Sequence, residues 1–213
     1  MQKFDVLIVG AGMVGLTLAL ALRQQGQLNV ALVDTNEISP LTDSPEVRVS
    51  AINAASEQIF INLGVWPLMQ QQRLQPYQHM HVWDKAGYGK LNFSVSDIVD
   101  EPLKAPQSPQ HLGHIIENNV IRHALWEKAK TDEGITFFTE DALTSLGVGD
   151  TEVFASFTSR LPITAKLVVG ADGANSWVRQ QLNMPIAFRD YDHHALVATI
   201  KCEAGHQNTA WQV

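Results

Sequence analysis

Cysteine is almost absent from this sequence, which holds Cys202 alone among 213 residues. A single cysteine cannot form an intrachain disulfide, and it excludes a dithiol redox mechanism within the chain. Because cysteine-poor chains without disulfides are typical of reducing compartments, we expect a cytoplasmic protein.

Positive charge is also scarce: 15 Lys and Arg residues oppose 22 Asp and Glu residues, so the formal net charge is -7. Proteins that bind nucleic acid use stripes of basic side chains to neutralise phosphates, and this sequence has no such stripe. We therefore expect no nucleic-acid partner. The sequence also lacks a polybasic or strongly amphipathic membrane anchor.

Recognisable metal-binding motifs are missing as well. The histidines include three close pairs: His79 and His81, His111 and His114, and His193 and His194. No pair has a nearby cysteine or belongs to a His-Glu-x-x-His helix, which are the usual zinc patterns. The prediction is that these histidines are hydrogen-bonded or solvated and that the protein has no metal site.

A nucleotide-binding pattern is what the sequence does contain, close to its start. Residues 4–9 form an apolar run that predicts a buried parallel strand, and Gly10, Gly12 and Gly15 follow it as G-x-G-x-x-G. In this pattern one glycine permits a tight turn, one lets the backbone approach a pyrophosphate, and one lets the next helix pack closely on the strand.

The segment after these glycines extends the same pattern. A helix over residues 13–25 would direct its first N–H groups toward the phosphates of a dinucleotide. A second strand over residues 29–33 ends at Asp34, where a carboxylate can accept a hydrogen bond from a ribose 2′-OH. Strand, glycines, helix, strand and acid in this order predict a dinucleotide site.

The rest of the chain continues as regular elements. Apolar periodicity predicts helices over residues 50–63 and Asn118–Lys130. Short apolar or alternating runs predict strands over residues 79–83, 90–93, 135–139, 143–148, 153–158 and 163–169. The last of these strands leads into a second glycine-rich segment, Gly170-Ala-Asp-Gly-Ala-Asn-Ser176. There Asp172 can accept from a sugar hydroxyl and Gly173 lets a ligand come close, although an Asp-Gly pair is also a common plain turn.

These motifs together resemble the flavin-dependent aromatic hydroxylases of the p-hydroxybenzoate hydroxylase type. The resemblance rests on the first glycine pattern, Asp34, the run Arg48-Val-Ser-Ala-Ile-Asn-Ala-Ala-Ser56 and the segment from Gly170 to Arg179. Leu63-Gly-Val-Trp66 and His114-Ile-Ile-Glu-Asn118 are more narrowly similar to the ubiquinone-biosynthesis hydroxylases, and among them to the VisC-type 2-polyprenylphenol 6-hydroxylases.

The resemblance implies an α/β fold, with a Rossmann-like FAD-binding domain and part of an inserted β-sheet substrate domain. The FAD-binding domain would comprise residues 1–75 and 111–185, and the partial substrate sheet residues 76–110 and 186–213. It also implies a set of FAD-contacting residues. These are Gly10, Gly12 and Gly15 at the pyrophosphate, Asp34 at the adenosine ribose, Arg48, Glu117 and Arg122 near the cofactor, and Asp172 and Gly173 between FAD and the nicotinamide donor.

The implied chemistry is hydroxylation of a polyprenylated phenol. In this family NAD(P)H reduces the flavin, O2 adds to it as a C4a-hydroperoxide, and one oxygen atom passes to the ring. Because the cofactor does this chemistry, no catalytic side chain can be assigned and no metal is expected. Other ubiquinone-biosynthesis proteins and a peripheral contact with the inner membrane are the implied partners.

One departure from the family concerns its second half, where a Gly-Asp-Ala-x-His motif holds the riboflavin part of FAD. That motif is missing here, since Gly149-Asp150 is followed by Thr-Glu in a predicted hairpin. We therefore expect the N-terminal part of such an enzyme, truncated at the C-terminus, with weak FAD binding and no turnover alone. Two alternatives stay open, another FAD- or NAD-dependent oxidoreductase and a non-catalytic assembly module.

Overall fold

The chain folds into two compact units in a computed structural model that describes residues 1–97 and 110–213. The first unit comprises residues 1–41, 63–65 and 121–195, and the second comprises residues 42–62, 66–120 and 196–213. These units are defined by packing alone, so the division expected above into FAD-binding and substrate domains stays a prediction. Part of its expected substrate sheet, residues 98–109, lies outside the described residues.

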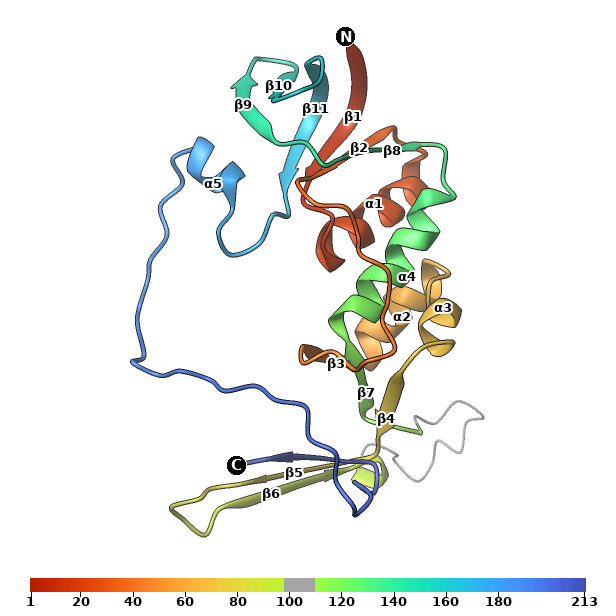
Figure 1. The fold of residues 1–213 in the computed structure, drawn as a ribbon, viewed down its shortest axis with the longest axis vertical. Coiled ribbons are helices and arrows are strands. Elements are labelled where there is room, and N and C mark those ends of the chain that lie inside the picture. The colour runs from red at the N-terminus through yellow and green to blue at the C-terminus, as the bar shows by residue number, and fades with distance from the viewer. Residues whose placement is uncertain (98–109) are drawn as a thin grey trace. The chain divides into compact units, whose positions relative to one another are not determined.

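A mixed β-sheet forms the centre of the first unit (Figure 1). Within the described residues its order is β8 (Ile135–Thr139), β2 (Val30–Asp34), β1 (Gln2–Val9), β11 (Ile163–Gly170), β10 (Val153–Phe157) and β9 (Leu143–Val148). The first four strands are parallel, while β10 runs antiparallel to β11 and β9 antiparallel to β10. Residues 6–9 of β1 and 30–33 of β2 are continuous buried apolar runs, as expected for parallel strands that are covered on both faces.

Helix α1 (Met13–Gly26) packs against β1 and β2 and follows directly from the first glycine pattern. Its buried residues Leu16, Ala19 and Leu20 recur at helical spacing, which gives the helix one apolar face. Leu7 and Val9 of β1 belong to a core cluster of buried residues from neighbouring strands. Helix α4 (Asn118–Lys130) has the bounds expected from its periodicity.

The second unit contains two small sheets. One has the order β3 (Val49–Asn53), β7 (Gly113–Glu117) and β4 (Leu74–Tyr77), and the other has the order β12 (Thr209–Gln212), β5 (His79–Trp83) and β6 (Lys90–Ser94). Helices α2 (Ala54–Asn62) and α3 (Trp66–Gln70) follow β3 along the chain. Among the described residues no helix combines the length and the apolar character needed to cross a membrane.

The helix predicted over residues 50–63 is wrong in its first four residues. Residues Val49–Asn53 form β3, whose exposure alternates along the strand, and only Ala54–Asn62 is helical. The reason is non-local, since β3 pairs with β7 in an antiparallel register that sets Ile52 opposite His114. A strand partner more than 60 residues away overrides local periodicity.

Candidate functional site

The first glycine pattern forms a loop at the carboxyl end of β1, where two glycines are required by packing. Gly10 has a φ of +109°, and a Cβ placed on it would lie 2.4 Å from the carbonyl oxygen of Ala171. A Cβ on Gly15 would lie 2.0 Å from the carbonyl oxygen of Gly10. These contacts are with backbone atoms, which cannot turn aside, so the loop packs against both α1 and the end of β11.

Gly12 differs from the other two because its surroundings are open. It has a φ of -77°, which any residue can adopt, and no heavy atom lies within 4 Å of the position that its Cβ would take. It is also the N-cap of α1, and its lack of a side chain leaves that helix end without a side-chain cap. The first N–H groups of a helix attract anions, so this open cradle fits a pyrophosphate.

Asp34 and Arg122 hold the glycine loop from two sides. Oδ2 of Asp34 accepts a hydrogen bond from the Ala11 N–H at 2.8 Å, and Nε of Arg122 donates to the Ala11 carbonyl at 2.9 Å. The Arg122 Nη2 atom lies 3.7 Å from the same Asp34 oxygen. Because a carboxylate has about four acceptor positions, Asp34 keeps capacity for a ribose hydroxyl, and that contact stays a prediction.

The second glycine-rich segment lies next to this loop. The Ala171 N–H donates to the Val9 carbonyl at 2.7 Å, and Gly173 has a φ of +82° with open space where its Cβ would be. Oδ1 of Asp172 accepts from Oγ of Ser176 at 2.6 Å, and Oδ2 accepts from the Val178 N–H at 3.1 Å. Asp172 therefore organises the turn into the short helix α5 (Trp177–Gln181).

The environment of Asp172 keeps its carboxylate ionised. Burial by itself would raise the pKa of this group, but hydrogen bonds from Ser176 and from the backbone outweigh burial and lower the pKa below its usual value. An ionised carboxylate is an acceptor only. Since both oxygens already accept a bond within the protein, the expected contact with a sugar hydroxyl would be an additional one, and it stays a prediction.

The remaining expected cofactor residues, Arg48 and Glu117, belong to the second unit. Arg48 is exposed, and its carbonyl accepts from the Asn118 N–H at 3.0 Å. Glu117 is buried at the end of β7 and binds Arg73 through two hydrogen bonds, at 2.6 Å to Oε1 and 3.1 Å to Oε2. It also accepts from the Glu46 N–H at 2.9 Å, so the side chain fastens the 42–46 segment to β7. The sequence pattern did not indicate Arg73, which belongs to no motif.

Replacement of Glu117 by Gln should destabilise the chain in a pH-dependent manner. The bond from Arg73, with help from the Glu46 N–H, lowers the pKa of Glu117 below its usual 4.5 despite burial. A lowered pKa stabilises the folded state above the unfolded pKa, and this stabilisation disappears as the pH falls through the folded pKa. We expect Glu117→Gln to lose about 2 kcal/mol at pH 7, and progressively less as the pH falls below the usual pKa of a glutamate, as measured by urea unfolding.

The matched control for this prediction is Glu127→Gln in α4. Glu127 pairs with Lys130 at 2.9 Å, but both side chains are exposed by more than 40%. Exposed pairs of this kind contribute about 0.3–0.5 kcal/mol. An equal effect of the two substitutions, or a Glu117→Gln effect that does not shrink at low pH, would contradict the role given to the Arg73 ion pair.

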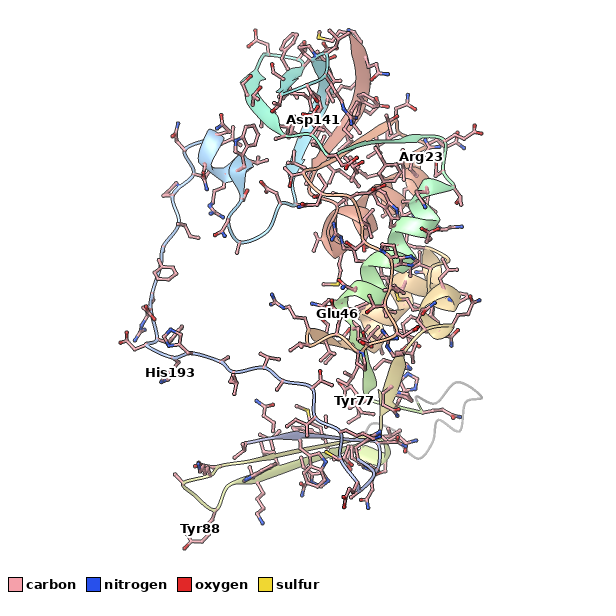
Figure 2. The ribbon with its side chains drawn as sticks, viewed as in Figure 1. Arg23, Glu46, Tyr77, Tyr88, Asp141 and His193 are labelled. Carbon is pink, nitrogen blue, oxygen red and sulfur yellow. The ribbon has the colours of Figure 1, made fainter. Side chains whose placement is uncertain are left out.

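A pocket lies on the β12–β5–β6 sheet of the second unit. Its volume is about 280 Å³, and its lining residues are His81, Val82, Trp83, Lys90, Asn92 and Trp211. The rings of His81 and Trp211 stack with their centroids 4.8 Å apart. Tyr88 lies at the tip of the neighbouring β5–β6 turn, where its side chain is fully exposed (Figure 2). Aromatic walls with a few polar groups suit a ring-containing ligand.

A sequence profile for the FAD binding domain matches residues 3–211 of the chain. The chain belongs to this family. The match covers both units, including the glycine loop, Asp34 and Asp172.

Two curated relatives of this FAD-binding chain are enzymes named for ubiquinone biosynthesis or for a ubiquinol. It is 35% identical to the 3-demethoxyubiquinol 3-hydroxylase of Escherichia coli (strain K12), over 99% of this chain and 52% of that one. It is 31% identical to the mitochondrial ubiquinone biosynthesis monooxygenase COQ6 of Dictyostelium discoideum, over 93% of this chain and 43% of that one. The chain thus spans about half the length of these relatives.

Solved structures of flavoproteins share the fold of this FAD-binding chain. P. aeruginosa PqsL in complex with 2-aminobenzoylacetate superposes with a TM-score of 0.71 and 19% identity, which covers 89% of this chain and 48% of PqsL. The flavin-dependent monooxygenase PieE, in complex with FAD and substrate, gives a TM-score of 0.64 and 21% identity, with 85% of this chain and 32% of PieE covered. The expected fold class, a Rossmann-like FAD-binding fold of the p-hydroxybenzoate hydroxylase type, is confirmed.

Proposed function

We propose that this chain supplies the FAD-binding half of a flavin-dependent monooxygenase that hydroxylates a polyprenylated phenol in ubiquinone biosynthesis. The observation that carries the proposal is the open cradle at Gly12, where the uncapped N-terminus of α1 meets a loop held by Asp34 and Arg122. Such a cradle suits the pyrophosphate of a dinucleotide, and the family profile identifies that dinucleotide as FAD.

Each expected residue has a defined part in this proposal. The glycine loop and the first N–H groups of α1 would hold the pyrophosphate, and Asp34 would accept from the adenosine ribose. Arg122 would keep the Ala11 peptide in place, while Asp172 and Gly173 would line the cofactor beside Gly10. Bound FAD would supply the transfer of electrons from NAD(P)H and the activation of O2, which no side chain of this chain can supply.

The names of the relatives support the proposed substrate class. The E. coli and Dictyostelium enzymes are named for demethoxyubiquinol and ubiquinone biosynthesis, and a third relative, at 27% identity, is the ubiquinone hydroxylase UbiM of Neisseria meningitidis. We propose a polyprenylated phenol in the pocket near Trp83 and Trp211, with the VisC-type 6-hydroxylation as the particular step. A polyprenylated phenol is apolar and resides in the membrane. We therefore propose that the protein obtains it through peripheral contact with the membrane and with other ubiquinone-biosynthesis proteins.

Titration of the purified chain with FAD and, separately, with NAD tests the cofactor part of this proposal. We expect quenching of flavin fluorescence that saturates with a Kd on the order of micromolar or weaker, and no binding of NAD. Binding of NAD without FAD would favour an NAD-dependent oxidoreductase. Binding of neither would favour an assembly module that keeps the fold without the cofactor.

The substrate part of the proposal has its own measurement. A short-chain 2-polyprenylphenol should quench the tryptophan fluorescence of the chain, and Trp211→Phe should reduce that quenching because Trp211 lines the pocket. Benzoate is the control ligand, since it shares the ring but lacks the apolar tail. Quenching by benzoate alone would contradict the substrate class.

We expect no NAD(P)H-dependent hydroxylation by this chain alone, and detectable turnover would contradict that expectation.

A further inference from the structure

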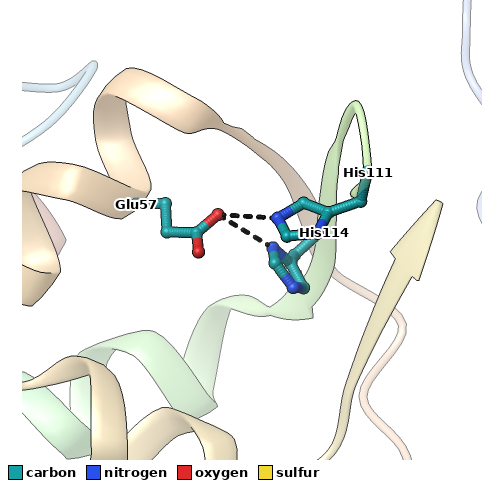
Figure 3. Close-up of side chains that lie close together, drawn as sticks. All are labelled: Glu57, His111 and His114. Atoms are coloured by element: carbon teal, nitrogen blue, oxygen red, sulfur yellow. Dashed lines mark hydrogen bonds and ion pairs between the residues drawn. The ribbon is translucent and has the colours of Figure 1, made fainter. Parts of the chain in front are cut away.

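Three side chains that the cofactor site does not use converge in the second unit. Oε2 of Glu57 lies 3.1 Å from Nε2 of His111 and 3.2 Å from Nδ1 of His114 (Figure 3). The three potential ligand atoms all lie within 4.8 Å of one another. We call Glu57, His111 and His114 the Glu-His-His cluster. Among the described residues it is the one group of three such side chains with spacing that could hold a metal ion.

Backbone pairing fixes the positions of these side chains. Strand β3 sets Ile52 opposite His114 on β7, and α2 begins immediately after β3, so Glu57 in its first turn lies near the start of β7. The segment before β7 is also held, because the Leu112 N–H donates to the Tyr77 carbonyl at 2.8 Å. The cluster is therefore preorganised by the β3–β7–β4 sheet.

His114 is the member of the Glu-His-His cluster with a buried nitrogen that lacks a hydrogen-bond partner. Only 7% of the residue is exposed, and Nδ1 has no hydrogen-bond partner although the Glu57 oxygen is 3.2 Å away. The His111 ring lies beside the His114 ring at 4.2 Å, and Trp66 meets it edge to face at 5.0 Å. A buried nitrogen close to a carboxylate without a hydrogen bond is an arrangement that a cation between the two atoms would satisfy.

Charge and protonation agree with a metal site. Burial, and then the neighbouring His111, lower the pKa of His114, and these effects outweigh the attraction of Glu57. A neutral imidazole is the form of histidine that coordinates metals. The Glu57 carboxylate supplies negative charge toward a divalent ion.

We propose that the Glu-His-His cluster binds a divalent transition-metal ion of the zinc class. Two imidazoles and one carboxylate form a ligand set found in zinc sites with three protein ligands and one open position. Even with the two nitrogens a full 4.8 Å apart, a point about 2.4 Å from all three atoms exists, and rotation of the two histidine side chains toward each other would reach zinc–nitrogen bonds of about 2.0–2.1 Å. Mg²⁺ and Ca²⁺ are disfavoured because they prefer all-oxygen ligands.

The ion would link α2 to the start of β7. Glu57 belongs to α2, His114 belongs to β7, and His111 lies in the segment that leads into that strand. A metal bound only in the folded state adds its binding free energy to stability. At free Zn²⁺ near 100 times Kd, the unfolding midpoint should rise by roughly 5–10 °C.

Metal binding by the full 213-residue chain, prepared without a histidine tag, tests the proposal. After dialysis against Zn²⁺, we expect one equivalent of zinc by elemental analysis, and Co²⁺ should produce visible d–d absorption of a low-coordinate site. Glu57→Gln and His111→Gln should each weaken Zn²⁺ binding by more than the roughly 10–100-fold caused by losing an outer partner of a ligand. Circular dichroism of both variants checks that they fold.

His194→Gln is the matched control, because it removes an exposed histidine from another close pair of the sequence. It should leave zinc stoichiometry, the Co²⁺ spectrum and the thermal shift unchanged, and Mg²⁺ should produce no shift in any variant. Absence of zinc from the wild-type chain would overturn the proposal. Equal loss of binding in His194→Gln and in the cluster variants would also overturn it, since that result indicates adventitious surface binding. Neither outcome would affect the FAD titration.

Discussion

Gly10→Ala should lower the stability of the chain by about 3 kcal/mol, because two costs add at this position. A non-glycine residue at a φ of +109° carries about 1–2 kcal/mol of backbone strain. The new Cβ would also lie 2.4 Å from the Ala171 carbonyl oxygen, and overpacking against atoms that cannot move aside costs about 1–3 kcal/mol.

A smaller term acts in the opposite direction. Replacing glycine by alanine reduces the freedom of the unfolded chain and stabilises the folded state by about 0.4–1 kcal/mol. Strain and overpacking exceed this gain, so the net effect is destabilising. For a chain of this size, a loss of about 3 kcal/mol corresponds to a fall of roughly 6–12 °C in the unfolding midpoint, measured by circular dichroism.

Gly12→Ala is the control for this measurement, since it adds the same methyl group to the same loop. Gly12 has an ordinary φ and open space around its Cβ position. It should therefore change the midpoint by only a few degrees, within what a poorer N-cap costs. Similar midpoints for Gly10→Ala and Gly12→Ala would show that the Cβ position of Gly10 lies farther than 2.4 Å from the Ala171 carbonyl oxygen.

Local sequence patterns predicted the helices and strands whose secondary structure depends least on pairing with distant segments. Helix α4 begins at Asn118 and ends at Lys130 as its periodicity indicates, and β5 has the expected bounds of His79–Trp83. Apolar runs also marked β1 and β2, because their buried residues 6–9 and 30–33 have no polar side, and a similar run marked β11 although Lys166 and Leu167 are exposed. Strand β12 falls within the expected substrate sheet, but its bounds were not predicted, since Thr209–Gln212 is short and pairs in parallel with β5 more than 120 residues before it.

The glycine loop shows what the family resemblance could and could not supply. The resemblance placed Asp34 and Arg122 near a cofactor, but it did not predict that both bind the Ala11 peptide, from 23 and 111 residues away. Asp172 was expected to face a ligand, yet its oxygens also cap the turn into α5. These are contacts between backbone and distant side chains, and no local spacing encodes them.

The Glu-His-His cluster was missed for a related reason. The usual zinc patterns place a cysteine or a His-Glu-x-x-His helix beside the ligand histidines, and His111 and His114 have neither. Glu57 lies 54 residues before His111 and reaches it only because β3 pairs with β7, in the very region where the sequence pattern indicated a continuous helix. Because the segment of β3 was predicted to be helical, the proximity of Glu57 to the two histidines was not predicted either.

Gly12→Val should abolish measurable FAD binding while the chain stays folded. The valine side chain would fill the open cradle at the N-terminus of α1, where the pyrophosphate is proposed to lie. It would exclude the phosphates from the N–H groups and the dipole of that helix. We expect roughly a 100-fold loss of affinity or more, which corresponds to about 2.7 kcal/mol, in a titration followed by flavin fluorescence.

The stability of Gly12→Val separates a blocked ligand site from a damaged fold. Valine is a poor N-cap but its Cβ meets no neighbouring atom, so the unfolding midpoint should fall by no more than about 4 °C. Gly89→Val is the matched control, because Gly89 in the β5–β6 turn also has open space at its Cβ position and belongs to no proposed ligand site. Unchanged FAD affinity in a folded Gly12→Val chain would show that the pyrophosphate does not bind at this loop. If the unfolding midpoint of Gly12→Val falls as far as that of Gly10→Ala, Gly12 is a packing residue. The open space at Gly12 would then not be a ligand site.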